Sequence, residues 1–363
     1  MLREYHGVAL QRTQRVSLCI QFGFDGDYHT MAGMSLKNQH LSIRNITLGL
    51  SVHRPEMIPY ISECMRRHDA IFLEEPPADG FEEMLTGTLA VEDYLRPLDV
   101  EYPDFSRKMC YLLRKLKAEG KAIFQVEPYM EILLGIHAFF AAGHRPGDLQ
   151  KDSIQYPVYL AERNATGALL DYYQTAMTES FGKTLEAVKR FARLDAARFR
   201  LRDSLRAQAL APLAEKFPTA YIEAVVIHYP LWRLLRRQFS APKRLQVFFL
   251  ADAPLKILGK KRRLYSPGDQ LTLLYIFQPN TAQPKREAAL AARSLIYAKL
   301  IAKEERTDDL HTLPHLRDEL MCIQTASRLS LDDCRRLFPL VRRVDTKQAH
   351  QILAQYQASN EFP

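Results

Sequence analysis

Short apolar runs along the chain have the length and composition of strands that are buried on both faces. Each is rich in Ile, Val, Leu or Phe, and polar or turn-forming residues bound it on both sides. Parallel sheets covered by helices contain strands of this kind, whereas half-exposed strands alternate apolar and polar positions. The predicted strands are residues 46–52, 70–73, 122–126 and 221–227, with two further candidates at 15–22 and 244–250.

Segments with helical spacing separate these strands. Residues 56–65 follow Pro55, which suits a first helical turn, and residues 105–118 and 130–142 are each closed by a nearby glycine. Residues 162–216 are mostly helical. The strand–helix–strand order implies parallel strand pairs joined by right-handed crossovers. The sequence therefore predicts an α/β fold with a mainly parallel central sheet flanked by helices.

The last third of the chain has a different pattern. Residues 255–258 and 271–277 have a β-like composition, and the turn-forming residues 266–269 lie between them, which predicts a β-hairpin. Residues 284–306 and 315–359 are rich in Ala, Leu, Arg and Glu and predict helices. The expected division is an α/β domain with the candidate site, residues 1–250, and a C-terminal hairpin and helical region, residues 251–363.

The composition is that of an ordinary globular protein, with 363 residues of which 47% are hydrophobic and 25% charged. The five cysteines are scattered and form no CxxC pair, so neither a zinc ribbon nor a disulfide framework is indicated. The N-terminus lacks the apolar core of a signal peptide, and the most apolar stretch, 132–142, is too short to span a bilayer. These features predict a cytoplasmic protein with reduced thiols and no membrane span.

Charge is unevenly distributed along the chain. Residues 53–104 contain 13 Asp or Glu against 4 Arg or Lys, a net of −9, whereas residues 183–263 contain 19 Arg or Lys against 6 Asp or Glu, a net of +13. The two regions could face each other or form solvated helix faces. The alternative is a cationic patch that attracts an anionic substrate, a nucleic acid or a membrane.

Polar side chains follow three of the predicted strands. His53 and His228 each end an apolar run, and the acidic pair Glu74-Glu75 ends another. Ligands bind at the carboxyl ends of strands in open α/β sheets. His53, Glu74 and His228 could share a divalent transition metal there, or act without metal as general bases that activate water. Neighbouring strand residues point to opposite faces, so only one glutamate is expected to enter the site, and Glu74 is favoured.

Further polar residues could line the same edge. Arg202 lies on the helix before the last predicted strand, where its guanidinium could hold a carboxylate or phosphate of the substrate. Alternatively, Arg202 pairs with Asp203 or another acidic side chain. Gln125 and Glu127 end the third strand and could contribute, unless they cap the following helix.

These motifs resemble the superfamily that contains TIKI/TraB proteins, erythromycin esterases and ChaN-like haem-binding proteins. The resemblance covers roughly residues 42–240, with Val225 and Val226 standing where the superfamily pattern has glycines. It implies an α/β fold and hydrolysis of peptide or ester bonds, or haem binding. The segments that carry the resemblance are Leu50-Ser51-Val52-His53, Phe72-Leu73-Glu74-Glu75, Arg202-Asp203-Ser204-Leu205-Arg206-Ala207 and Val225-Val226-Ile227-His228.

Three functions follow as hypotheses. The first is a hydrolase in which His53, Glu74, His228 and Arg202 act on an anionic small molecule or peptide, either without metal or with a metal held by His53, Glu74 and His228. The second is a non-catalytic protein that binds haem or another anionic ligand. The third is a nucleic-acid-binding or scaffold role for residues 183–263, although few aromatic side chains accompany those arginines. The chain contains no GxxxxGK[ST], GxGxxG, HExxH or GxSxG motif. Its oligomeric state stays open.

Overall fold

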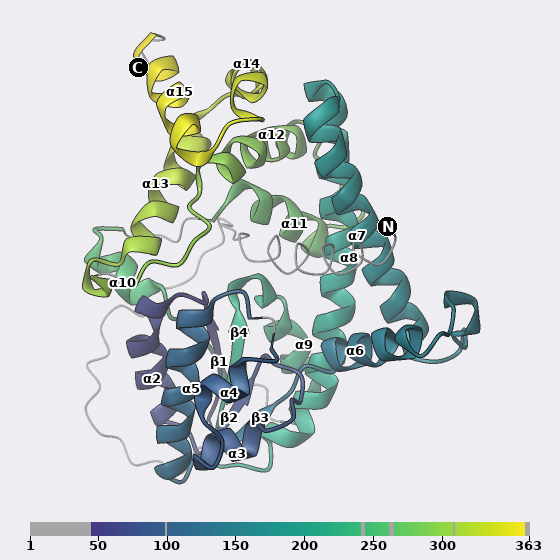
Figure 1. The fold of residues 1–363 in the computed structure, drawn as a ribbon, viewed down its shortest axis with the longest axis vertical. Helices are drawn as coiled ribbons and strands as arrows, with labels where there is room; N and C mark the ends of the chain where they lie inside the picture. The colour runs from purple at the N-terminus through teal and green to yellow at the C-terminus, as the bar shows by residue number, and fades with distance from the viewer. Residues whose placement is uncertain (1–44, 99, 241–243, 261–264, 308, 360–363) are drawn as a thin grey trace.

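The computed structural model describes residues 45–98, 100–240, 244–260, 265–307 and 309–359, so the strand predicted at 15–22 lies outside the described residues. Five strands form one parallel sheet flanked by helices, which confirms the predicted α/β fold (Figure 1). The strands are β1 (Asn45–Ser51), β2 (Ala70–Leu73), β3 (Ala122–Gln125), β4 (Thr219–Val225) and β5 (Leu245–Phe249). The strand predicted at 221–227 ends two residues early, because Val226–His228 form a 3-10 turn.

The order of the strands in the sheet is β3-β2-β4-β1-β5. The chain therefore moves across the sheet in one direction from β1 through β2 to β3, and returns through β4 to β5. Right-handed crossovers put the helices of these two halves on opposite faces. The connections that leave β1 and β4 go to opposite faces although the strands are neighbours, so a crevice is expected at their carboxyl ends.

The helices follow this rule. On one face lie α2 (Ile58–Arg66) and α5 (Pro103–Ala118), and the short helices α3 (Phe81–Thr86) and α4 (Val91–Leu95) pack against α5. The other face is covered by α8 (Phe181–Ala214) and α9 (Leu231–Gln238), with α6 (Pro128–Ala141) and α7 (Gln155–Thr178) packed on α8 (Figure 1). The predicted helices at 56–65, 105–118, 130–142 and 162–216 are thus confirmed, the last as two helices.

The centre of the sheet is fully buried, as the apolar runs predict. Leu48, Phe72 and Ile222 on the three central strands have no exposed surface. Gly49 in the middle of β1 is in close contact with the Tyr221 ring of β4, and a Cβ atom at residue 49 would overlap that ring. The glycine is therefore a packing requirement of the sheet.

The predicted C-terminal β-hairpin is wrong. Its two segments are helices, α10 (Asp252–Ile257) and α11 (Pro267–Phe277). The residues that suggest a turn are a helix start: Ser266 is the N-cap, its hydroxyl accepts from the Asp269 amide, and Pro267 occupies the first turn. The apolar run after them is buried against α8 and α12. The helical extension is confirmed, as α12 (Pro284–Leu300), α13 (Pro314–Arg328), α14 (Leu331–Val341) and α15 (Thr346–Ser359).

Helix α8 connects the two largest buried apolar clusters. Its C-terminal part, with Leu210, packs in the cluster around the sheet, and its N-terminal part, with Phe199, packs in the cluster of the C-terminal helices (Figure 1). The cluster around the sheet also includes Leu316 and Leu320 from α13. The domain boundary at residue 250 stays a prediction. Within the described ranges, no helix combines the length and the apolar character needed to cross a membrane.

Candidate functional site

The predicted polar strand ends meet at the carboxyl edge of the sheet. His53 and His228 follow the neighbouring strands β1 and β4, whose last residues, Ser51 and Val225, are paired in register. Glu74 follows β2, the strand on the other side of β4. The crevice expected from the topology is therefore where the candidate residues lie.

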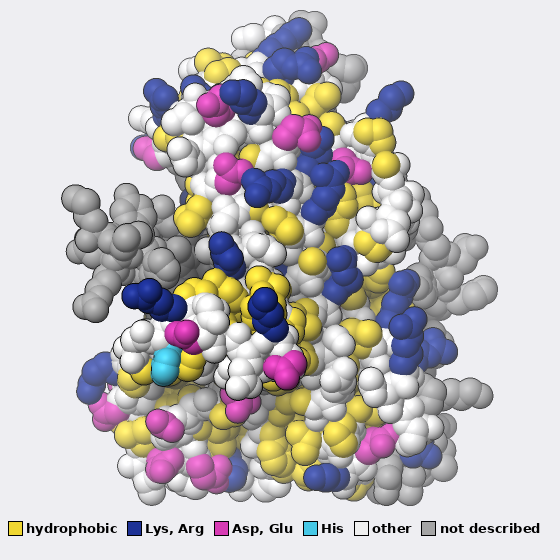
Figure 2. Space-filling model, turned by 90° about the vertical axis from the view of Figure 1, so that its right-hand side faces the viewer, with side chains coloured by type: hydrophobic (Ala, Val, Ile, Leu, Met, Phe, Trp, Pro, Cys, Tyr) yellow, Lys and Arg dark blue, Asp and Glu magenta, His cyan; other side chains and the backbone are white. Residues whose placement is uncertain are grey.

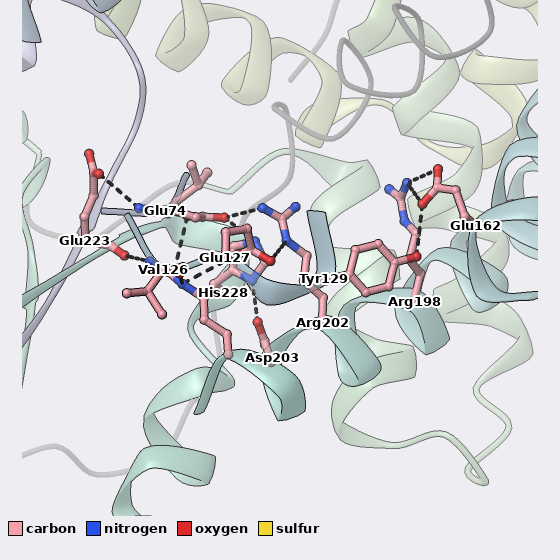
Figure 3. A network of polar contacts seen from close by, with 12 residues as sticks. Glu74, Val126, Glu127, Tyr129, Glu162, Arg198, Arg202, Asp203, Glu223 and His228 are labelled. Atoms are coloured by element: carbon pink, nitrogen blue, oxygen red, sulfur yellow. Dashed lines mark hydrogen bonds and ion pairs between the residues drawn. The ribbon is translucent and has the colours of Figure 1, made fainter. Parts of the chain in front are cut away.

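Glu74 is the centre of a buried network of charged side chains (Figure 3). Its Oε1 lies 2.8 Å from Nε2 of His228 and accepts a hydrogen bond of 2.9 Å from Nη2 of Arg202. Its Oε2 accepts a hydrogen bond of 2.6 Å from the backbone N–H of Val225. Because the positive charges around it outweigh the effect of burial, the pKa of Glu74 lies well below its ordinary value.

His228 is held between two carboxylates. Nε2 contacts Glu74, and Nδ1 is hydrogen-bonded to Asp203 of α8. Burial alone would lower the pKa of His228, but Glu74 and Asp203 outweigh it and raise the pKa to about 9. His228 is thus an imidazolium at neutral pH, and both of its ring nitrogens are donors.

Two arginines one turn apart on α8 complete the network. Nε of Arg202 lies 3.2 Å from Glu127, the residue before α6, and Nη2 of the same side chain reaches Glu74. Arg206 is completely buried and donates to two carbonyl oxygens, those of Val126 at 3.0 Å and Glu223 at 2.7 Å. Three acidic side chains therefore meet three basic ones. The acidic members are Glu74, Glu127 and Asp203, and the basic members are Arg202, Arg206 and His228.

The network continues along α8 to a second group of buried charges (Figure 3). Arg198 donates to Glu162 of α7 at 3.1 Å and to Asp195 at 2.6 Å, and the hydroxyl of Tyr129 donates to Glu162 at 3.0 Å. Some of the basic side chains of residues 183–263 thus point inward. On the side of the molecule that carries α6 and α7, Lys and Arg are interspersed with acidic and hydrophobic side chains (Figure 2).

His53 is different from the other candidates. It is half-buried, and its ring stacks on Phe105 of α5 with 4.7 Å between the centroids. Burial lowers the pKa of His53 to about 4; Glu74 acts in the opposite direction, and Arg54, Arg202 and His228 lower it further. The imidazole is therefore neutral at pH 7 and lies within the electrostatic field of the buried network.

His53 lines a small pocket at the edge of the sheet. The opposite wall comes from the C-terminal region and includes Arg306 in the loop after α12, and His315, Asp318 and Glu319 on α13. The volume of the pocket is about 10 Å³, which is close to the roughly 10–15 Å³ that one water molecule requires. The pocket can thus hold a water molecule beside a neutral imidazole.

Two carboxylates fix this opposite wall to the α/β part. Glu56, in the 3-10 turn that precedes α2, accepts the backbone N–H groups of His315 and Leu316 at the start of α13, both at 3.0 Å. Glu305 accepts the backbone N–H groups of Asp104 at 2.8 Å and Phe105 at 3.0 Å at the start of α5. Each carboxylate caps a helix across the interface, where it also interacts favourably with the helix dipole. Glu305 therefore fixes the backbone of Phe105, the residue that stacks on His53.

The predicted metal ligands do not form a free ligand set. Zinc and related ions bind neutral imidazole nitrogens and carboxylate oxygens. Both nitrogens of His228 are engaged by carboxylates, and both oxygens of Glu74 are engaged by donors. Among the residues with a described position, no group of three or more His, Cys, Asp or Glu side chains could hold a metal ion. The residues present thus do not fit a metal held by His53, Glu74 and His228.

The structure brings Glu74, Arg202 and His228 into contact, with His53 beside them. Arg202 faces two protein carboxylates, so its predicted role as a clamp for substrate stays a prediction. The favoured glutamate enters the network, whereas Glu75 accepts a hydrogen bond of 3.0 Å from Gln125. The sequence pattern assigns no role to Arg206, although its spacing of four residues from Arg202 puts both on one helix face.

The chain is similar to an uncharacterized protein from Archaeoglobus fulgidus, with 29% identity over 286 residues that cover 78% of this chain and 94% of that protein. No protein-family model matches the chain, and no solved structure matches it. The name of the archaeal protein states no activity, so function follows from the geometry of the site alone.

Proposed function

We propose that the protein is a hydrolase of ester or peptide bonds in which His53 is the general base. The observation that carries the proposal is the neutral imidazole of His53 beside a pocket with room for one water molecule. A neutral imidazole within hydrogen-bond reach of water can remove a proton as the water attacks a carbonyl carbon. The substrate carbonyl would lie at the mouth of the pocket.

The buried network has a positioning role in this proposal. Arg202, Arg206 and His228 fix the charge and the orientation of Glu74, and Glu74 binds the backbone of Val225 at the end of β4. The network holds the carboxyl ends of β2 and β4 together beside the loop that carries His53. The resemblance to TIKI/TraB proteins and erythromycin esterases points to the same class of reaction.

The other two hypotheses have less support. Pockets for ligands of drug size have volumes of roughly 300–1,000 Å³, whereas the pocket at His53 has about 10 Å³, so the residues there do not fit haem. The nucleic-acid hypothesis requires accessible arginines. Arg198, Arg202 and Arg206 of residues 183–263 are used in internal ion pairs, although others, such as Arg190 and Arg236, are exposed.

The proposal is tested with p-nitrophenyl acetate as the ester and a fluorogenic casein as the peptide substrate. We expect the purified protein to hydrolyse at least one of them. Replacing His53 by Gln should lower kcat by about 10²–10⁴-fold, the usual contribution of a general base. His311→Gln is the matched control, because His311 is exposed. Activity on neither substrate, or full activity of His53→Gln, would refute the proposal.

The pH profile gives an independent readout. Because the pKa of His53 is about 4, the base is active in its neutral form above that pH. With p-nitrophenyl acetate, whose leaving group departs without a proton, the rate should therefore be constant from pH 6 to 8 and should fall only as the pH approaches about 4. An acid limb centred near 6.5, the ordinary pKa of histidine, would show that another or a more exposed imidazole is the base.

A further inference from the structure

Helix α13 forms part of the pocket wall opposite His53. Its first turn is fixed by Glu56, which accepts the backbone N–H groups of His315 and Leu316. Residues four apart lie on the same face of a helix, so His315 and Glu319 both reach the pocket, together with Asp318. Glu56 thus determines where the side chains of α13 face His53.

Two of these three side chains of α13 are already used within the protein. His315 is hydrogen-bonded to Glu56 through Nδ1, and its Nε2 accepts the backbone N–H of Arg306 at 2.8 Å. Asp318 accepts the backbone N–H of Ala302 at 2.9 Å. The carboxyl group of Glu319 takes part in no hydrogen bond or ion pair among the described parts of the chain. Glu319 is half-buried, so its carboxyl group keeps access to the pocket.

The surroundings of Glu319 favour its protonated form. Burial raises the pKa of Glu319, and the nearby carboxylates of Asp318 and Glu56 add to this effect, while Arg54 and His315 oppose it. His53 on the other wall has a lowered pKa. Two groups of one site whose pKa values are shifted in opposite directions are suited to act as a base and an acid.

We propose that Glu319 is the proton donor to the leaving group in the reaction at His53; this rests on the proposed hydrolase function. His53 takes a proton from water, and the oxygen of that water forms a bond to the carbonyl carbon. The bond from carbon to the leaving oxygen or nitrogen then breaks, and the leaving atom takes the proton of the Glu319 carboxyl group. The proton on His53 returns to Glu319 through solvent, which restores both groups and leaves an acid and an alcohol or amine.

A proton donor can be separated from a structural residue by the leaving group of the substrate. The p-nitrophenolate ion is a stable anion and departs without a proton, whereas ethoxide needs one. We therefore expect Glu319→Gln to hydrolyse p-nitrophenyl acetate within about 3-fold of the wild-type rate. On ethyl acetate the same variant should be slower by about 10²-fold or more, because it lacks the acid.

Glu304→Gln is the matched control, since Glu304 is exposed in the loop before α13, and it should leave both rates unchanged. The urea midpoints of the wild type and of Glu319→Gln show whether the variant keeps its fold. Equal losses on the two esters, no loss on ethyl acetate, or a wild type that cleaves only the aryl ester would overturn the role of Glu319. A wild type that cleaves neither ester nor casein would instead overturn the hydrolase proposal itself.

Discussion

Replacing Arg206 by Met tests whether the buried charge network holds the carboxyl edge of the sheet together. The side chain has no exposed surface, and it donates to the carbonyl oxygens of Val126 and Glu223 at 3.0 and 2.7 Å. It also lies 3.5 Å from Glu127 and 3.7 Å from Glu74. Methionine preserves an unbranched stem and its apolar contacts, but it removes every donor and the positive charge.

The size of the effect can be estimated in two ways. Each hydrogen bond from a charged group contributes about 1.5–3 kcal/mol, which gives roughly 3–6 kcal/mol for the two carbonyl contacts. Removing one partner of a buried ion pair costs about 3–5 kcal/mol, because a charge is left uncompensated. The two estimates describe the same loss and are not added. We expect Arg206→Met to lower the free energy of unfolding by about 4 kcal/mol.

The assay is urea unfolding at pH 7, followed by circular dichroism. Arg190→Met is the matched control on the same helix, because Arg190 is exposed and pairs with Asp171 at 3.1 Å on the surface; it should cost about 1 kcal/mol or less. Combining Arg206→Met with Glu127→Gln removes a carboxylate that has lost one of its two arginine partners. The double variant should therefore be more stable than the sum of the single changes by about 1 kcal/mol or more.

Two results would refute this reasoning. A loss for Arg206→Met as small as that for Arg190→Met would mean that the inner arginine contributes no more than a surface ion pair. Strict additivity with Glu127→Gln would mean that Arg206 and Glu127 do not interact energetically, despite the distance of 3.5 Å between them.

The remaining predictions concern pH and packing. The raised pKa of His228 stabilises the fold fully below pH 6.5, and this contribution, roughly 3 kcal/mol, is lost as the pH rises to about 9. Urea unfolding from pH 6 to 9 should therefore show a smaller decline for His228→Gln than for the wild type. Burial raises the pKa of Glu223 to about 8, so this residue makes the free energy of unfolding of both proteins decline as the pH rises towards 8. Parallel curves for the wild type and His228→Gln would contradict the prediction. Gly49→Ala forces a methyl group into the Tyr221 ring and should cost about 1–3 kcal/mol. The same change should cost little in a Tyr221→Leu background, and an equal cost there would show that the ring is not the obstacle.

The sheet could be predicted from the sequence because its strands are short, apolar and separated by helices. Short apolar runs also explain why the C-terminal segments were wrongly predicted to form a β-hairpin. An apolar run such as 271–277 has no clear period of two or 3.6 residues, so a buried strand and a buried helix look alike. The N-cap at Ser266, followed by Pro267, was the signal that favours the helix.

The meeting of Glu74, His228 and Arg202 was predictable in part. Parallel strands end at one edge, so polar residues after β2 and β4 must lie close together. The pairing within the network was not predictable, because Asp203 binds His228 while its neighbour Arg202 binds Glu74. Adjacent residues on a helix point in different directions, and only the placement of α8 decides what each of them contacts.

The contribution of the C-terminal helices to the site had no signal in the sequence. Glu56 and His315 are 259 positions apart, and nothing in the local pattern of either relates them. The carboxylate of Glu56 can cap α13 only because the fold puts the start of that helix opposite it. Such a contact follows from packing alone, and it is what puts Glu319 on the wall opposite His53.

In the proposed site the buried network positions the strand ends, and His53 acts as the base. The charges of the network act on His53 in opposite directions, because Glu74 raises its pKa while Arg202 and His228 lower it. Burial, rather than repulsion by the neighbouring cations, is accordingly the largest cause of the lowered pKa of His53. Because burial keeps the imidazole neutral, charged residues can hold the strand ends beside His53 without protonating it. Arg202 and Arg206 of α8 are directed inward, where their positive charges bind the carboxylates of Glu74 and Glu127 at the edge of the sheet.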